Sequence, residues 1–139
     1  MPQLLVVDDD EVIRQTLYEL LSEQYICQTA ETAEKAIARL EADIYDVVLT
    51  DISMPGLSGL ELLGHVRQLY PNTPVIIISG ISDRAHAEGL IKIGAFDYLL
   101  KPFQLEAVEM SVKRAIEFRN QLQERKGNQD EPTDWNIVK

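Results

Sequence analysis

The chain has 139 residues, a length that suits one globular domain, and 45% of them are hydrophobic, an ordinary value for a folded protein and too high for a disordered one. Its 23 acidic and 13 basic residues give a formal net charge of −10 at pH 7, and an acidic surface repels phosphate backbones and anionic lipids. The composition therefore argues against direct binding of nucleic acids or membranes by this segment and favours the binding of cations.

Short apolar runs rich in β-branched residues alternate with longer amphipathic segments. The apolar runs predict five strands, at residues 4–7, 25–29, 47–50, 75–78 and 96–100. Apolar residues at helical spacing predict five helices, which with their capping residues cover 11–23, 32–40, 58–69, 82–94 and 104–125. Thr32 and Ser82 are the expected N-caps of the second and fourth helices, residues 58–61 match a capping box, and Gly94 is expected to end the fourth helix in a left-handed conformation. This alternation predicts an α/β fold, in which right-handed βαβ units build a parallel sheet with helices on both faces.

The composition changes after about Gln123, where a polar stretch without apolar residues begins. We therefore expect a folded domain at residues 1–122, and a polar tail or the start of a linker to an output module at residues 123–139. Trp135, Ile137 and Val138 begin a new apolar pattern, which fits either a tail docked on the domain or the first residues of a neighbouring domain. The pattern does not distinguish these alternatives.

Cellular location is suggested by two further features of the chain. Cys27 is the single cysteine, so no disulfide forms within the chain, as suits a reducing cytosol. The first residues lack the basic and apolar segments of a signal peptide, and no apolar stretch approaches the ~20 residues that span a bilayer. We expect a cytoplasmic protein, or a cytoplasmic piece of one, without membrane contact.

Charged and hydroxyl side chains follow four of the five predicted strands. Asp8 and Asp9 follow the first strand and Asp51 the third, while Ser79 and Lys101 come at the ends of the fourth and fifth. Because ligands bind outside the carboxyl ends of strands in an open parallel sheet, we expect these side chains to converge at one edge. The second strand contributes no comparable residue.

Three carboxylates this close together repel one another, and a divalent cation with oxygen ligands, Mg²⁺ in particular, relieves that repulsion. No cysteine or histidine lies nearby, which argues against zinc. Lys101 could hold an anion such as a phosphoryl group and Ser79 could donate a hydrogen bond to it, so the pattern suits phosphoryl transfer onto a carboxylate. Taken singly, the same residues have simpler explanations: Asp9 or Asp10 as a helix cap, Ser79 as a partner of the backbone, and Lys101-Pro102 as a strand end.

Four blocks carry a family resemblance. They are Leu5–Asp10, Asp51–Gly59, Ile78–Gly80 and Asp97–Phe103. In order and spacing they resemble the signature blocks of bacterial response-regulator receiver domains, the CheY-like family, over about residues 3–120. The resemblance implies a doubly wound, flavodoxin-like sheet of five parallel strands in the order 2-1-3-4-5. It also implies a two-component signalling function.

Carried over by position, the resemblance implies that Asp51 is the phosphoacceptor, supplied by a sensor histidine kinase or a phosphotransfer protein. Asp9 would bind Mg²⁺ directly with Asp8 in support, and the backbone carbonyl of Ser53 would be a further ligand. The chain would then not be an enzyme acting on another substrate, since it would only take up and lose its own phosphoryl group.

The resemblance also implies a switch. Lys101 would pair with the phosphoryl group next to a cis Lys101-Pro102 bond, Ser79 would be the switch hydroxyl, and Tyr98 the aromatic residue that turns inward with it. The surface of the fourth helix, fifth strand and fifth helix would change, controlling a downstream output and offering a site for a homodimer. Ile81 stands at a position that tunes phosphate lifetime in the family, and its bulk predicts slow autodephosphorylation.

Other classes of function fit the sequence less well. A doubly wound phosphatase needs a second acid two residues after its nucleophile, where this chain has Ser53. Neither a phosphate-binding G-x-x-x-x-G-K-[ST] loop nor a G-x-G-x-x-G dinucleotide motif is present, and an unphosphorylated interaction module would be expected to lack a site residue. His65 and His86 are isolated on predicted helices, so we expect both to be solvated, and no helix-turn-helix pattern is seen.

Overall fold

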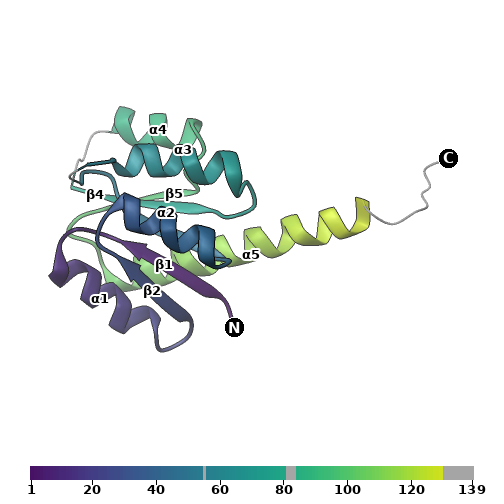
Figure 1. Cartoon of the computed structure of the whole chain (residues 1–139), viewed down its shortest axis with the longest axis horizontal. Coiled ribbons are helices and arrows are strands. Elements are labelled where there is room, and N and C mark those ends of the chain that lie inside the picture. Colours follow the sequence, from purple (N-terminus) through teal and green to yellow (C-terminus); the bar gives the residue numbers. More distant parts are fainter. Residues whose placement is uncertain (55, 81–83, 130–139) are drawn as a thin grey trace.

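The computed structural model describes residues 1–54, 56–80 and 84–129, in which five strands and five helices alternate along the chain (Figure 1). The strands are β1 (Gln3–Val7), β2 (Ile26–Ala30), β3 (Val47–Asp51), β4 (Val75–Ser79) and β5 (Asp97–Leu100). The helices are α1 (Glu11–Leu21), α2 (Ala33–Ala42), α3 (Gly59–Leu69), α4 (Arg84–Lys92) and α5 (Leu105–Gln129). The predicted α/β class is confirmed.

The five strands form one parallel sheet in the order β2-β1-β3-β4-β5. The chain moves outward from β1 to β2, returns to β3 on the other side of β1, and continues to β4 and β5. This order reverses direction between β1 and β3, so the loops that follow these two strands diverge and leave room for a ligand between them. The order implied by the resemblance is therefore confirmed.

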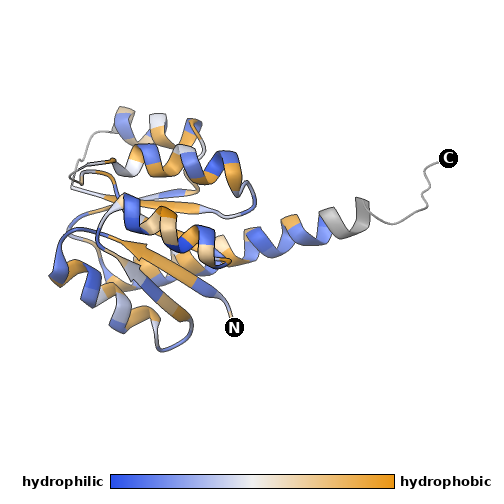
Figure 2. Ribbon diagram, in the orientation of Figure 1, coloured by the Kyte–Doolittle hydropathy of each residue, from blue (hydrophilic) through white to orange (hydrophobic). Residues whose placement is uncertain are grey.

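Helices cover both faces of the sheet, and each face has its own apolar core. Alternate residues of each central strand point to opposite faces: Leu5 and Val7 belong to the core beneath α2, α3 and α4, whereas Leu4 and Val6 belong to the core beneath α1 and α5. In Figure 2 the central strands are accordingly almost continuously apolar, while the helices carry polar residues on their outer sides. Burial on both sides explains why these strands show no alternation in sequence.

Local sequence explains where several helices begin and end. Asp10 caps α1, since its carboxylate accepts hydrogen bonds from the amides of Val12 and Ile13, and Thr32 caps α2 as predicted. The predicted capping box of α3 is present in full. Gly94 follows α4 with a φ of 116°, the left-handed conformation expected there, whereas the proposed cap Ser82 lies outside the described residues.

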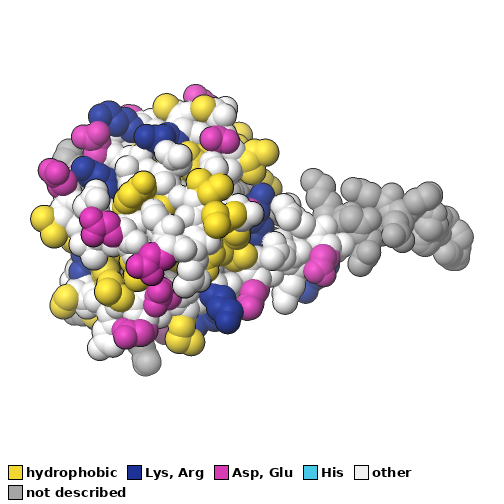
Figure 3. Space-filling view, turned by 90° about the horizontal axis from the view of Figure 1, so that it is seen from below, with side chains coloured by type: hydrophobic (Ala, Val, Ile, Leu, Met, Phe, Trp, Pro, Cys, Tyr) yellow, Lys and Arg dark blue, Asp and Glu magenta, His cyan; other side chains and the backbone are white. Residues whose placement is uncertain are grey.

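Helix α5 is longer than predicted and continues to Gln129 (Figure 1). The residues after Gln123 are polar, but Glu124, Arg125 and Lys126 are good helix formers, so the helix extends without an apolar face to bury. Gly127 and Asn128 are poor helix formers and come just before its end at Gln129. Seen from below, α5 projects from a body on which acidic, basic and apolar side chains are interspersed (Figure 3). The domain boundary after residue 122 stays a prediction, and Trp135 and its neighbours lie outside the described residues.

A buried arginine ties α5 to the edge of the sheet where the strands begin. Arg119 is only 8% exposed, and its Nε donates a hydrogen bond of 2.9 Å to the Asp46 carboxylate just before β3. One terminal nitrogen of Arg119 also donates to the backbone carbonyl of Asn72 at 3.0 Å and to the Thr73 hydroxyl at 3.2 Å. Asp46 in turn accepts a hydrogen bond from the Gln3 amide at 2.7 Å. This network, which we call the Arg119 network, joins α5 to β1, β3 and β4.

Candidate functional site

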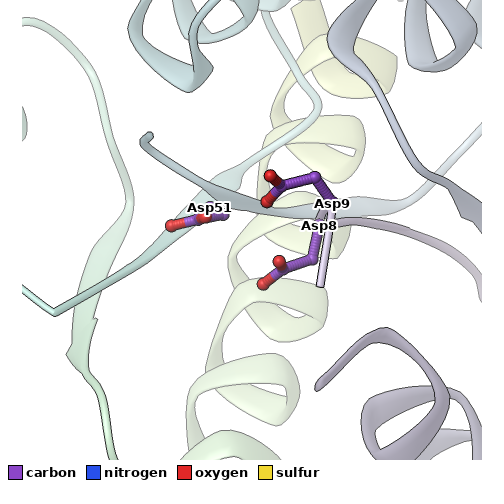
Figure 4. A group of neighbouring side chains, drawn as sticks. All are labelled: Asp8, Asp9 and Asp51. Atoms are coloured by element: carbon purple, nitrogen blue, oxygen red, sulfur yellow. The ribbon is translucent and has the colours of Figure 1, made fainter. Parts of the chain in front are cut away.

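Three carboxylates meet at the carboxyl edge of the sheet. One carboxylate oxygen from each of Asp8, Asp9 and Asp51 lies within 4.8 Å of the other two. Figure 4 shows the three side chains, from the ends of β1 and β3, pointing to the same side. Asp8 is 1% exposed and Asp51 8%, whereas Asp9 is exposed. The convergence expected from the strand ends is therefore present, and two of its three carboxylates are buried.

Hydrogen bonds to the backbone fix the buried carboxylate of Asp8. One of its oxygens accepts a hydrogen bond of 2.9 Å from the Asp10 amide, and its backbone amide donates to the carbonyl of Ala30 on β2. The backbone carbonyl of Asp8 accepts a hydrogen bond of 2.9 Å from Arg14 on α1. Because Asp10 caps α1, the capping role considered for Asp9 belongs to Asp10, and Asp9 keeps its carboxylate beside the other two.

Lys101 places its ammonium group between the two buried carboxylates. Its Nζ lies 3.1 Å from Oδ2 of Asp8 and 3.4 Å from Oδ1 of Asp51. The Lys101 amide donates a hydrogen bond of 2.7 Å to the backbone carbonyl of Ser79, which extends the pairing of β4 and β5 up to the site. The peptide bond between Lys101 and Pro102 is cis, as the resemblance implied.

The surroundings of the two groups shift their proton affinities. Burial raises the pKa of the Asp51 carboxyl, and the neighbouring Asp8 raises it further, while Lys101 and the Ser53 amide act in the opposite sense without cancelling the rise. For Lys101, burial lowers the pKa, but the hydrogen bond and the charge of Asp8, together with Asp51, outweigh that effect and raise it. Lys101 thus stays cationic, and one cation does not offset the three carboxylates.

The raised pKa of Asp51 leads to a prediction about stability. A carboxyl with a higher pKa in the folded state contributes stability at pH values below its unfolded pKa, and that contribution is lost as the pH rises through its folded pKa. Near neutral pH the ionised Asp51 therefore destabilises the fold, and we expect Asp51→Asn to raise the free energy of unfolding. Urea titrations should show a gain that shrinks as the pH falls through the acidic range.

Magnesium provides the control for this stability prediction. A bound cation offsets the same repulsion, so added Mg²⁺ should stabilise the unmodified chain more than Asp51→Asn and reduce the difference between them. A variant that is less stable than the unmodified chain near neutral pH would show that the contact between Asp51 and Lys101 outweighs the repulsion.

A glycine allows the segment after β3 to pass close to α3. A Cβ placed on Gly59 would lie 2.0 Å from the backbone oxygen of Asp51 and 2.8 Å from the Cα of Ile52. The Gly59 amide also donates a hydrogen bond of 3.0 Å to the carbonyl of Ile52. From the sequence, Gly59 was predicted as part of a capping box and of the Asp51–Gly59 block, without a role for its missing side chain. Glycine is a poor helix former, so its place at the first helical position suggests a close approach of backbone.

Glu34 is a second residue near the site that no sequence pattern singles out. From the first turn of α2 its carboxylate accepts a hydrogen bond of 3.3 Å from the Leu57 amide, and it lies against Gly56, whose φ is 76°. Gly56 and Leu57 belong to the loop after β3, which also carries the exposed residue Ser53. Glu34 and Leu57 are 23 positions apart, so no local pattern indicates their contact.

The remaining predicted residues lie on β4 and β5. Ser79 is buried at the end of β4, and Tyr98 is half-buried on β5, packed against the core beneath α2, α3 and α4. The expectation that His65 and His86 are solvated is wrong, because both are half-buried and each lies beside a tyrosine ring. Ile81, to which we assigned a role in phosphate lifetime, lies outside the described residues.

Comparison with known proteins gives a consistent result. The family model for the response regulator receiver domain matches residues 4–113. The DNA-binding transcriptional regulator NtrC of Salmonella typhimurium is 41% identical over 130 residues, which are 92% of this chain and 28% of that regulator. The chain thus spans less than a third of the length of this curated relative.

Among the helices that the structure describes, none combines the length and the apolar character that a membrane span requires.

Two solved structures extend the comparison to the fold. A response regulator receiver domain protein from Clostridium thermocellum is 32% identical with a TM-score of 0.80, and the match covers 88% of this chain and 99% of that one. NtrX from Brucella abortus, solved with ATP, is 33% identical with a TM-score of 0.85 over 90% of this chain and 29% of NtrX. Sequence blocks, strand order and overall fold agree, and the chain belongs to the family of response-regulator receiver domains.

Proposed function

We propose that this receiver domain is a phosphoacceptor switch in which Asp51 takes a phosphoryl group from a phosphohistidine on a sensor histidine kinase or a phosphotransfer protein. The observation that carries the proposal is the convergence of Asp8, Asp9, Asp51 and Lys101 at one edge of the sheet. A group of acids beside a fixed cation suits a site that holds a metal ion and a phosphoryl group together.

In this proposal the Asp51 carboxylate is the nucleophile. One of its oxygens forms a bond to phosphorus while the bond from phosphorus to the histidine nitrogen breaks, and that nitrogen takes up a proton. Lys101, which already lies 3.4 Å from Oδ1 of Asp51, would neutralise part of the added negative charge. Ser79 would donate its hydroxyl hydrogen to a phosphoryl oxygen after transfer.

The donor set fits magnesium. Asp8, Asp9, Asp51 and the backbone carbonyl of Ser53 would hold Mg²⁺, a hard cation that prefers oxygen ligands. In the described residues the cluster that could hold a metal consists of carboxylates alone, without histidine or cysteine. When bound, the ion would supply positive charge to the phosphoryl oxygens and to the crowded carboxylates.

Phosphorylation would act on the rest of the domain through Ser79 and Tyr98. Movement of the Ser79 hydroxyl toward the new phosphoryl group would let Tyr98 turn inward, which changes the surface formed by α4, β5 and α5. That surface would then bind the output machinery or a second copy of the chain. The chain would turn over no external substrate, since the phosphoryl group is taken up and lost by Asp51 itself.

The whole protein's role is also a proposal, because the chain spans 28% of the regulator NtrC. That relative is a DNA-binding transcriptional regulator, and we propose an output of this kind for a protein that contains this domain. The acidic composition of the chain argues that DNA contacts would come from another domain. The single cysteine and the expected kinase partner fit a cytoplasmic location.

Incubation with Mg²⁺ and a small acyl phosphate tests the proposal. We expect a phosphoryl adduct that is stable in acid, labile in base, and assigned to Asp51 by mass spectrometry of peptides. Asp51→Asn should abolish it, because an amide is not a nucleophile toward phosphorus, and Asp43→Asn, at an exposed carboxylate after α2, should leave it unchanged. An adduct that persists in Asp51→Asn, or chelation of Mg²⁺ without effect on its formation, would contradict the proposal.

A further inference from the structure

A histidine of α4 packs on the expected switch residue Tyr98. The ring centroids of His86 and Tyr98 are 6.1 Å apart and their planes meet at 80°, an edge-to-face arrangement. His86 is half-buried, and its Nε2 is buried without a hydrogen-bond partner among the residues that the structure describes. Tyr98 also packs against the core to which Leu90 of α4 belongs. The His86 ring therefore links α4 to the side chain whose movement would carry the signal.

The two features of this contact act in opposite directions. Edge-to-face ring pairs are attractive, so the His86 ring holds Tyr98 in its present position. A buried nitrogen without a hydrogen-bond partner raises the free energy of the arrangement that buries it. A rearrangement that separates α4 from Tyr98 would expose Nε2 to water and remove that penalty. The ring contact thus holds Tyr98 in its resting position, while the buried Nε2 lowers the free energy needed to move Tyr98 out of that position.

We propose that His86 is a positioning residue for the switch, and that its unpaired Nε2 sets how readily phosphorylation of Asp51 drives Tyr98 and α4 into the active arrangement. This inference rests on the proposed function, in which Asp51 is phosphorylated and Tyr98 responds. It assigns a role in the free energy of switching to a residue that lies outside the cluster of Asp8, Asp9, Asp51 and Lys101.

The chain contains a matched control for this inference. His65 of α3 lies beside Tyr70 with ring centroids 6.3 Å apart and planes at 55°, and in the described part of the chain its Nε2 is likewise buried without a hydrogen-bond partner. Tyr70 is the residue that ends α3, and it lines a cavity of about 490 Å³ that also includes Thr73 and Arg119, at the edge of the sheet opposite the site. The chemistry of the two pairs is alike, but only His86 contacts a switch residue.

The experiment compares His86→Phe with His65→Phe, since phenylalanine keeps the ring and removes the nitrogen. Beryllofluoride with Mg²⁺, a stable mimic of the phosphoryl group, is titrated into each chain while amide resonances of α4 and β5 are followed by NMR. We expect His86→Phe to raise the beryllofluoride concentration at half-maximal change by about fivefold or more, the size that an unpaired buried polar atom would produce. His65→Phe should stay within about twofold of the unmodified chain by the same reasoning.

Urea unfolding of the same chains separates a structural role from a role in switching. Both variants should gain similar stability, because each loses one unpaired nitrogen. Equal beryllofluoride midpoints for the two variants, or no shift in His86→Phe, would overturn the inference. His86→Leu provides a second reading if His86→Phe does not fold, and it should move the midpoint in the same direction by a smaller factor.

The two proposals fail in distinguishable ways. A response of the unmodified chain to beryllofluoride with no effect of the His86 variants would remove the role of His86 and leave the proposed function intact. If the unmodified chain does not respond and forms no adduct at Asp51, the proposed function fails and the inference fails with it.

Discussion

Gly59→Ala is expected to lower the free energy of unfolding by about 3 kcal/mol, at the upper end of the values for overpacked sites. The added methyl group would lie 2.0 Å from the backbone oxygen of Asp51, far inside van der Waals contact, and the atoms it meets are backbone atoms that cannot rotate away. The start of α3 or the end of β3 must then move. Because Asp51 lies at that end of β3, we also expect weaker Mg²⁺ binding and slower phosphorylation.

Gly64→Ala on the same helix is the control. Its added methyl group would meet no other group of the described residues within 4 Å, and alanine in an exposed helix interior is more stable than glycine by about 0.5 to 1 kcal/mol. Urea unfolding should therefore show the two substitutions of α3 acting in opposite directions. A Gly59→Ala chain as stable as the unmodified one, with normal Mg²⁺ affinity, would show that the loop after β3 adapts without effect on the site.

Arg119→Met is expected to lower the free energy of unfolding by about 3 kcal/mol, because removing one partner of a buried ion pair leaves the other charge uncompensated. The Arg119 network supplies hydrogen bonds to Asp46, Asn72 and Thr73, and methionine can replace only its packing. The Asp46 side chain is 30% exposed, so water would solvate part of its charge and the loss should not reach the upper end of the range for buried pairs.

Arg114→Met provides the comparison within α5. Arg114 pairs with Asp97 at 2.9 Å, but its side chain is 54% exposed, and Asp97 also accepts a hydrogen bond from Ser111. An exposed pair of this kind contributes about 1 kcal/mol or less. If denaturant titrations give equal losses of unfolding free energy for Arg114→Met and Arg119→Met, burial of the ion pair does not determine its contribution to stability. Arg119 and Asp97, the partner of Arg114 and the first residue of β5, both lie toward the edge where the strands begin, opposite Asp51. Neither substitution should therefore change the rate of phosphorylation measured on folded protein.

The sequence alone predicts those parts of this molecule that follow from local patterns and from strand ends. Alternating elements predict the parallel sheet, and the rule for strand ends brings Asp8, Asp9, Asp51 and Lys101 together before any coordinate is known. Helix caps are equally local, which is why Thr32 and the capping box of α3 were predicted correctly.

Features that depend on residues far apart in the sequence were not predicted. Arg119 reads as one more charged residue on a helix, because its partners Asp46 and Thr73 lie 73 and 46 positions away. His86 looks solvated for the same reason, since only the folded chain brings β5 beneath α4. The end of α5 was placed too early because the polar composition suggested a loop, whereas polar residues with high helix propensity extend a helix whose start is already packed.

The Arg119 network also determines the direction in which the chain leaves the domain. Helix α5 begins near the cluster of Asp8, Asp9, Asp51 and Lys101, crosses one face of the sheet, and is held at the far edge by Arg119. It then continues to Gln129, about 15 Å further along its axis. Asp51, where a phosphodonor would approach, and the end of α5 at Gln129 therefore lie at opposite ends of the described domain. The helix end through which the chain leaves the domain therefore does not obstruct access of a phosphodonor to Asp51.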